Sequence, residues 1–214
     1  MICGVDEAGR GPVLGPLVVC GVSVRSDEKL RELGVKDSKK LTPKKRAELA
    51  PKIRRIADVE VVEISADQID AARTQMTMNA LEAKVFAAII EKLSPDDAYV
   101  DAADVNEHEF ERMIRACLKC RPRIVSEHKA DDNYPVVMAA SIVAKVTRDE
   151  RVREIEMEIG SPIGSGYQTD ETTMNFLNDY VQRNGKCPPH TRTSWEPAKS
   201  IMMRKSLRTL DKFE

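Results

Sequence analysis

The alternation of strand-like and helix-like segments is the feature that most constrains this fold. Short runs rich in β-branched residues, which predict strands, are separated by stretches whose apolar residues recur at helical spacing. Strands that alternate with helices along one chain predict an α/β fold with a mixed sheet flanked by helices. The predicted strands cover residues 2–5, 16–24, 59–64, 98–101 and 123–125.

Turn and capping residues refine this prediction. A Gly/Pro-rich turn at residues 9–12 separates the first two strands, which we expect to form a hairpin-like pair. Thr42 and Pro43 have the residue types of an N-cap and a first helical position, and Gly160 follows the strongest helical segment. The predicted helices cover residues 27–33, 43–57, 78–93, 106–118, 134–159, 170–181 and 197–210.

The length of the chain predicts one domain with a small addition. At 214 residues and 42% hydrophobic content, it is long enough for one α/β domain, which we place at residues 1–185. Residues 186–214 then form a helical C-terminal element. No run of about 18 apolar residues occurs, so no membrane span is expected.

The five cysteines predict reduced thiols and a cytoplasmic location. Their number is odd and the sequence shows no signal peptide. Cys117 and Cys120 form a lone C-x-x-C, which lacks the second pair of ligands that a structural zinc site requires.

The distribution of charge indicates a nucleic-acid partner more than the net charge of −1 does. Basic residues gather in two zones, between residues 36 and 55 and after residue 181. Two such zones suit a surface that follows phosphates, although two solvated helix faces explain them equally well. The second zone consists of Arg183, Lys186, Arg192, Lys199, Arg204, Lys205, Arg208 and Lys212.

Carboxylates at the ends of predicted strands are the candidate catalytic groups. Asp6 and Glu7 follow the first strand, Asp101 ends the fourth, and Asp131 precedes the longest helix. Strand ends of an open α/β sheet gather at one crevice. Oxygen ligands without Cys or His suit Mg²⁺ or Mn²⁺, and clustered acids would repel one another without cations. Two such ions about 3.5–4 Å apart support phosphoryl transfer.

Spacing leaves three questions about these acids open. Any one of these acids, taken alone, is more readily explained as a solvated residue at a strand end than as a catalytic group. Asp104 and Asp132 compete with Asp101 and Asp131 for the same roles. Neighbours on a strand point to opposite faces, so Asp6 and Glu7 can share a site only if the strand breaks there.

Several blocks, in order, resemble the ribonuclease HII family. The likeness extends from residue 1 to about residue 195, and the compact form is similar to the archaeal branch. The blocks are GVDEAGRGP (4–12), DSKKL (37–41), YVD (99–101), HKAD (128–131), YP (134–135), AASIVAKV (139–146), RD (148–149), GSGY (164–167) and RTSW (192–195).

The resemblance implies a fold, a reaction and a set of acids. It implies a ribonuclease H-like fold with a helical C-terminal element. It also implies an endonuclease that cuts the RNA strand of RNA–DNA hybrids and nicks DNA 5′ to an embedded ribonucleotide, leaving 3′-hydroxyl and 5′-phosphate ends. The family's four metal-binding acids map onto Asp6, Glu7, Asp101 and Asp131.

Substrate contacts are expected at residues that can reach a ribose or a phosphate. Gly9, Arg10 and Gly11 can bring backbone groups close to a sugar, because glycine adds no Cβ. In the family, the corresponding motif reads the 2′-hydroxyl. The resemblance gives Tyr167 a contact with the deoxyribose after the ribonucleotide, whereas on composition alone it is a loop-packing aromatic. The candidate phosphate contacts are Lys39, Lys40, Ser141 and Lys145.

Two rival functions remain open at this point. One is a hybrid-binding protein without catalysis, which would gain nothing from acids beside phosphate. The other is a different metal-dependent nuclease on the same fold. The apolar and aromatic pattern of residues 207–213 suggests a contact with a sliding clamp, and the resemblance favours a monomer.

Overall fold

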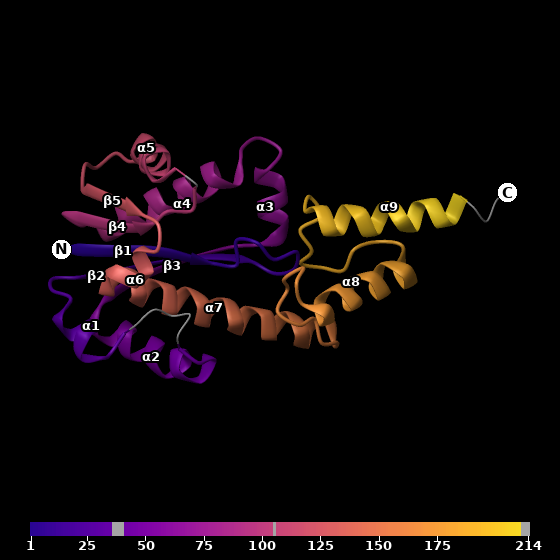
Figure 1. Ribbon diagram of the computed structural model, residues 1–214, viewed down its shortest axis with the longest axis horizontal. Helices are drawn as coiled ribbons and strands as arrows, with labels where there is room; N and C mark the ends of the chain where they lie inside the picture. Colours follow the sequence, from indigo (N-terminus) through magenta and orange to yellow (C-terminus); the bar gives the residue numbers. More distant parts are fainter. Residues whose placement is uncertain (36–40, 105, 211–214) are drawn as a thin grey trace. The chain divides into compact units, whose positions relative to one another are not determined.

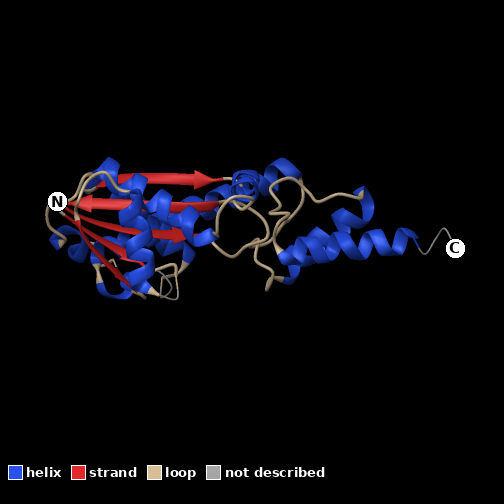
Figure 2. Cartoon of the chain, turned by 90° about the horizontal axis from the view of Figure 1, so that it is seen from above, coloured by secondary structure: helices blue, strands red, loops and turns tan. Residues whose placement is uncertain are grey.

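A computed structural model describes residues 1–35, 41–104 and 106–210. Its elements alternate as expected (Figures 1 and 2). Lys39 and Lys40 lie outside the described residues. The strands are β1 (Ile2–Ala8), β2 (Leu17–Val24), β3 (Asp58–Ile64), β4 (Asp97–Asp101) and β5 (Arg123–Glu127). The helices are α1 (Glu28–Glu32), α2 (Pro43–Ile56), α3 (Ala66–Ala72), α4 (Met78–Leu93), α5 (Glu107–Cys117), α6 (Ala130–Asn133), α7 (Pro135–Ile159), α8 (Glu171–Asn184) and α9 (Glu196–Leu210).

The five strands form one mixed sheet in the order β3-β2-β1-β4-β5. β1 pairs with β2 in antiparallel register, which confirms the predicted hairpin-like pair. β1 and β4 are parallel, as are β4 and β5. The expectation of a mixed sheet flanked by helices is therefore confirmed.

Most elements lie where the sequence places them, with two additions. The Thr42 hydroxyl accepts a hydrogen bond from the Lys45 amide at 3.2 Å, and Pro43 begins α2, as expected from the capping signals. α3 and α6 were not predicted. α6 has only four residues, too few to show a helical period. α3, in contrast, begins with a capping box between Ser65 and Gln68 that is readable in the sequence.

The chain divides into two compact units, each with its own core. The first holds residues 1–8, 18–63 and 76–148, and the second holds residues 9–17, 64–75 and 149–214. The predicted division into residues 1–185 and 186–214 stays a prediction. No helix among the described residues is long and apolar enough to cross a membrane.

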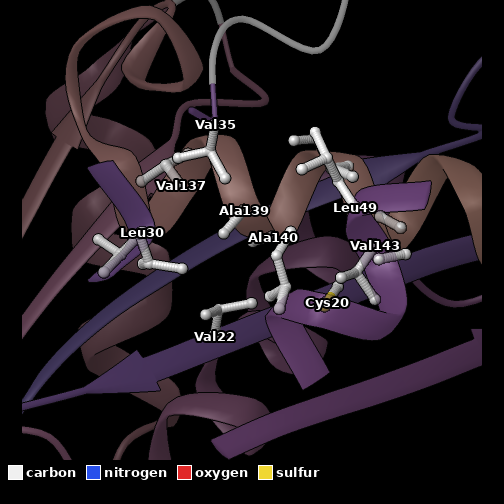
Figure 3. Packing of buried hydrophobic residues seen from close by; sticks show 14 of the residues in the cluster. Cys20, Val22, Leu30, Val35, Leu49, Val137, Ala139, Ala140 and Val143 are labelled. Carbon is white, nitrogen blue, oxygen red and sulfur yellow. The ribbon is translucent and has the colours of Figure 1, made fainter. Parts of the chain in front are cut away.

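The core of the first unit depends on very close packing of α7 against β1. A Cβ placed on Gly4 would lie 2.2 Å from the carbonyl carbon of Val136 and 2.3 Å from the nitrogen of Val137, so only glycine fits there. Figure 3 shows the α7 residues Val137, Ala140 and Val143 packed among side chains from β2, α1 and α2. The α7 backbone is thereby held against the strand that carries Asp6.

The second unit has a smaller core around the end of α7. Val152 and Ile155 of α7 pack with Leu177 and Val181 of α8, and Ile201 of α9 joins the same cluster. Val13 and Leu14, from the segment after β1, are also fully buried there. Gly9, Arg10 and Gly11 therefore closely precede, along the chain, two residues that are anchored in this core.

Candidate active site

Asp6 and Asp101 are neighbours on adjacent parallel strands. Val5 of β1 pairs in register with Val100 of β4, so the next residue on each strand is an aspartate. Paired residues of neighbouring strands project from the same face, and the strands lie about 4.8 Å apart. The two carboxylates therefore share one face of the sheet, as the strand-end argument predicted. This is the face that α7 covers, because Gly4 lies two residues before Asp6 on β1.

α6 brings Asp131 to the same region. Lys129 adopts a left-handed backbone (φ 58°), which turns the chain into α6 directly after β5. The Ala130 amide then donates a hydrogen bond to Oδ1 of Asp101 at 2.8 Å, which ties the start of α6 to the end of β4. Asp131, the next residue, is only 1% exposed.

Burial and hydrogen bonding separate Asp101 and Asp131 from their rivals. Asp132 is exposed, whereas Asp131 is buried and its charge acts on Asp6. Asp104 accepts hydrogen bonds from the Asn79 side chain and, at 3.0 Å, from the Asn106 amide. These contacts support Asp101 and Asp131 over Asp104 and Asp132.

The pKa of Asp6 reflects its burial first and the like charges beside it second. Burial raises the pKa of Asp6 to about 7, and the nearby charges of Asp101 and Asp131 act in the same direction. A hydrogen bond with Ser141 and the positive charge of Lys145 act to lower this pKa. A buried carboxylate with two acidic neighbours is an arrangement that a bound cation would stabilise.

Ser141 and Lys145 lie one turn apart on α7 and contact the acid cluster. The Lys145 ammonium donates a hydrogen bond to the Ser141 hydroxyl at 2.7 Å, and Ser141 is in turn hydrogen-bonded to Asp6. Ser141 is fully buried, whereas Lys145 is half-buried. Both residues were predicted as phosphate contacts. The structure places the Ser141 hydroxyl against a carboxylate, a contact that orients Asp6.

Glu7 does not follow the same pattern. β1 continues through Ala8, which pairs with Val18, so the strand does not break between Asp6 and Glu7. Consecutive side chains on an unbroken strand point to opposite faces. The assignment of Glu7 to the same metal site as Asp6 therefore stays a prediction.

The donor set is suitable for a hard divalent cation. Asp6, Asp101 and Asp131 offer only carboxylate oxygens, the ligands preferred by Mg²⁺ and Mn²⁺. Within the described ranges, no three His, Cys, Asp or Glu side chains are close enough together to hold one ion as they stand. Joint coordination would therefore require these side chains to rotate toward one another.

The predicted ribose-reading residues lie in the second unit. Gly9 has a left-handed backbone (φ 84°) and begins the turn after β1. A Cβ on Gly11 would lie 3.8 Å from Cε1 of Tyr167, so this glycine and the tyrosine ring are neighbours. The Tyr167 side chain is exposed. The structure therefore brings together two groups that the sequence placed more than 150 residues apart.

The two basic zones differ in their exposure. Lys44, Lys45, Lys52, Arg54 and Arg55 of α2 are exposed, in agreement with either a phosphate-binding or a solvated face. In the second zone, however, Arg192 is fully buried. It is therefore no surface cation, and its inclusion in a phosphate-following zone was wrong. Sequence reasoning missed both the hydrogen-bond partners of Arg192 and the role of Asp70.

The chain is similar to known ribonucleases over almost its whole length. A family model described as Ribonuclease HII matches residues 3–198. Ribonuclease HII of Methanoregula boonei is 46% identical over 213 residues, with 100% of each chain covered. The protein of the same name from Thermococcus sibiricus is 48% identical over 203 residues, which cover 92% of this chain and 89% of the relative.

Solved structures agree with this comparison. Ribonuclease H2 of Pyrococcus horikoshii has a TM-score of 0.88 at 41% identity, with 96% of this chain and 98% of the other covered. The ribonuclease HII of Archaeoglobus fulgidus, solved in complex with PCNA, has a TM-score of 0.87 at 40% identity, with 94% and 96% covered. These likenesses confirm the expected ribonuclease H-like fold. The chain therefore belongs to the ribonuclease HII family.

Proposed function

We propose that this chain is an endonuclease that hydrolyses the RNA strand of RNA–DNA hybrids and nicks duplex DNA 5′ to an embedded ribonucleotide. Membership of the ribonuclease HII family makes it a ribonuclease, and hence a hydrolase of phosphodiester bonds. The observation that carries the finer proposal is the buried Asp6, whose pKa is affected by the charges of both Asp101 and Asp131, with Asp6 and Asp101 each following the paired Val5 and Val100. The expected products have 3′-hydroxyl and 5′-phosphate ends.

Asp6, Asp101 and Asp131 are the residues that would hold Mg²⁺ or Mn²⁺, and Glu7 would join them only by reaching around the end of β1 from its opposite face. When bound, two such cations supply activation of the attacking water and stabilisation of charge at the leaving oxygen. The chain's own contacts orient the proposed ligands. The Ala130 amide holds Asp101, and the Ser141 hydroxyl holds Asp6. Such supporting contacts commonly set the affinity of a metal site.

Recognition of the substrate is assigned to other residues. Gly9, Arg10 and Gly11 would offer backbone groups to the ribose 2′-hydroxyl, and the exposed Tyr167 would pack on the neighbouring sugar. The proximity of Gly11 to Tyr167 supports a shared role. Lys39, Lys40 and Lys145 remain candidates for contacts with phosphate, and Ser141, which also holds Asp6, would contribute through the hydrogen bond that it accepts from Lys145.

The test uses a DNA duplex that contains one ribonucleotide, with Mg²⁺ or Mn²⁺ added. The unchanged protein should nick it 5′ to the ribonucleotide. Asp101→Asn should keep binding the duplex and cleave it more than about 100-fold more slowly. Loss of a contact that only supports a metal ligand typically costs about 10- to 100-fold in activity, and loss of a ligand itself should cost more. Asp104→Asn, which changes the rival acid, should keep most of the activity. Equal losses in both variants would remove the special role of Asp101.

The same assay separates the two rival functions. A protein that only binds hybrids would be inert before any substitution. A nuclease with another specificity would cleave the all-deoxy duplex as fast as the duplex with one ribonucleotide. Either outcome would refute the proposed function.

A sliding-clamp partner forms part of the proposal. The Archaeoglobus fulgidus relative was solved in complex with PCNA, and residues 207–213 of this chain carry an apolar and aromatic pattern. The side chain of Leu207, the first of these residues, is 51% exposed. Removal of residues 207–214 should abolish binding to a sliding clamp in a pull-down assay while cleavage of short duplexes persists. The monomeric state and the cytoplasmic location also remain proposals.

A further inference from the structure

Arg192 is a buried cation whose partners are backbone carbonyls of the segment after β1. Its Nη1 donates to the Arg10 oxygen at 2.7 Å, and its Nη2 donates to the Gly9 oxygen at 2.5 Å. Nε and Nη2 each donate to the Gly15 oxygen at 3.1 Å. The side chain is 0% exposed, so these bonds hold the guanidinium where water does not reach.

These bonds fix the polarity of two peptide planes. The C=O and N–H of a trans peptide point in opposite directions, and the described part of the chain has no cis peptide bond. With the Gly9 and Arg10 carbonyls directed at Arg192, the amides of Arg10 and Gly11 are directed away from it. Two successive N–H groups thus face the side opposite the buried guanidinium, as donors that could read a sugar oxygen.

Backbone pairing holds the same segment in register with Arg192. The Arg192 amide donates to the Val13 oxygen at 2.8 Å, and the Gly15 amide donates to the His190 oxygen at 2.9 Å. The Val13 amide donates to Gly166, the residue before Tyr167, at 2.8 Å. The segment from Gly9 to Gly15 is therefore attached both to the segment that contains Arg192 and to the loop that carries Tyr167.

Asp70 of α3 anchors the residues that follow Arg192. Its Oδ2 accepts from the amide and the hydroxyl of Thr193, both at 2.6 Å. Its Oδ1 accepts from the Ser194 hydroxyl at 2.6 Å and from the Ser194 amide at 3.3 Å. Burial acts to raise the pKa of Asp70, but these four hydrogen bonds outweigh it and hold the pKa below its usual value.

An aromatic side chain completes the support. Arg192 lies over the Trp195 ring, with its guanidinium carbon 5.0 Å from the ring centroid, and the guanidinium carbon of Arg73, the C-cap residue of α3, lies 5.1 Å from the same centroid. Cation–π contacts of this kind favour one orientation of a planar guanidinium. Arg192 is therefore restrained both by the Trp195 ring and by its carbonyl partners.

We propose that Arg192 is a positioning residue for ribose recognition, which fixes the Gly9-Arg10-Gly11 backbone with its amides presented to the substrate, and that Asp70 positions Arg192. This inference rests on the proposed function, since it assigns ribose recognition to that backbone. Lysine cannot replace Arg192, because one ammonium group lacks the planar fork that reaches carbonyls of three residues.

The test measures ribose discrimination separately from folding. Dissociation constants are measured with Mg²⁺ for an all-deoxy duplex and for the same duplex with one ribonucleotide, in the Asp101→Asn background that should bind without cleaving. We expect Arg192→Lys to reduce the preference for the ribonucleotide about five- to tenfold, the value of one or two hydrogen bonds, with little change for the all-deoxy duplex. Asp70→Asn should reduce the preference less, in the same direction.

Ile201→Val is the matched control, because it removes one buried methyl group from the core of the same unit. It should lower the thermal midpoint and leave the preference unchanged. If Arg192→Lys and Asp70→Asn keep the full preference for the ribonucleotide, whether their affinities are unchanged or fall equally for both duplexes, the positioning role is refuted. If the Asp101→Asn background itself shows no preference for the ribonucleotide, the proposed function fails before Arg192 is considered.

Discussion

Gly4→Ala should be among the most damaging single-methyl additions in this protein. The new Cβ would lie 2.2 Å from the Val136 carbonyl carbon and 2.3 Å from the Val137 nitrogen, whereas ordinary contacts begin near 3.4 Å. Both atoms belong to the backbone of α7, so no side chain can rotate away. Relief requires α7 to retreat from β1 by at least about 1 Å, which forfeits a quarter to a half of the dispersion energy at each affected contact.

The expected cost follows from the packing of α7. Insertion of a methyl group into a packed core typically costs 1–3 kcal/mol, and a clash with backbone belongs at or above the upper end, so we expect about 3 kcal/mol or more. For a chain of this length, that corresponds to a fall in the thermal midpoint of roughly 6–12 °C. Activity should fall as well, because retreat of α7 would draw Ser141 away from Asp6.

Gly21→Ala provides the comparison. Its Cβ would lie 2.3 Å from Cγ2 of Ile89 and 2.8 Å from Cδ1 of Leu93, which are side-chain atoms of α4 and can move. Thermal and urea unfolding of both variants, with cleavage assayed well below the midpoints, should show the larger loss of stability and activity in Gly4→Ala. Equal losses, or a Gly4→Ala protein as stable as the unchanged one, would refute this account of how α7 packs on β1.

Two further predictions concern charge and capping. The pKa of Asp6 is raised to about 7 in the folded protein, so ionisation of Asp6 is less favourable there than in the unfolded chain. The free energy of unfolding should therefore fall as pH rises from about 4 through 7, by at most about 4 kcal/mol at about 1.4 kcal/mol per pKa unit. With cations chelated, urea unfolding should show Asp6→Asn more stable than the unchanged protein by about 2 kcal/mol at pH 8 and no more stable at pH 4; a gain independent of pH would contradict the assignment. Thr42→Ala should lower the free energy of unfolding by about 1 kcal/mol at either pH, because the Lys45 amide loses its hydrogen-bond acceptor. Thr42→Ser keeps a hydroxyl and should be nearly as stable as the unchanged protein; equal losses in the two variants would show that the hydroxyl does not cap α2.

Local patterns in the sequence predicted most of the fold. α4 lies within the predicted bounds because its apolar spacing is regular over 16 residues, and α2 begins at the predicted cap. β1 was predicted too short, since the turn residues after it suggested an earlier end. That error matters, because continuation of β1 through Ala8 places Asp6 and Glu7 on opposite faces.

The site was predictable to the extent that its residues follow strands. Asp6 and Asp101 lie close together because β1 and β4 are parallel neighbours, and the ends of parallel strands gather at one edge of a sheet. The choice of Asp131 over Asp132 depends on burial, which spacing does not contain. From the sequence, Arg192 resembles any other surface cation, because the carbonyl groups that surround it lie more than 170 residues away in the chain.

The central claim is that Asp6, Asp101 and Asp131 bind divalent cations. The most direct test is a crystal structure of the protein soaked with Mn²⁺, in which anomalous scattering locates the ions. The account predicts Mn²⁺ coordinated by carboxylate oxygens of Asp6 and Asp101, with Asp131 as a further ligand. Mn²⁺ bound only at other residues, in a protein that cleaves its substrate, would contradict it.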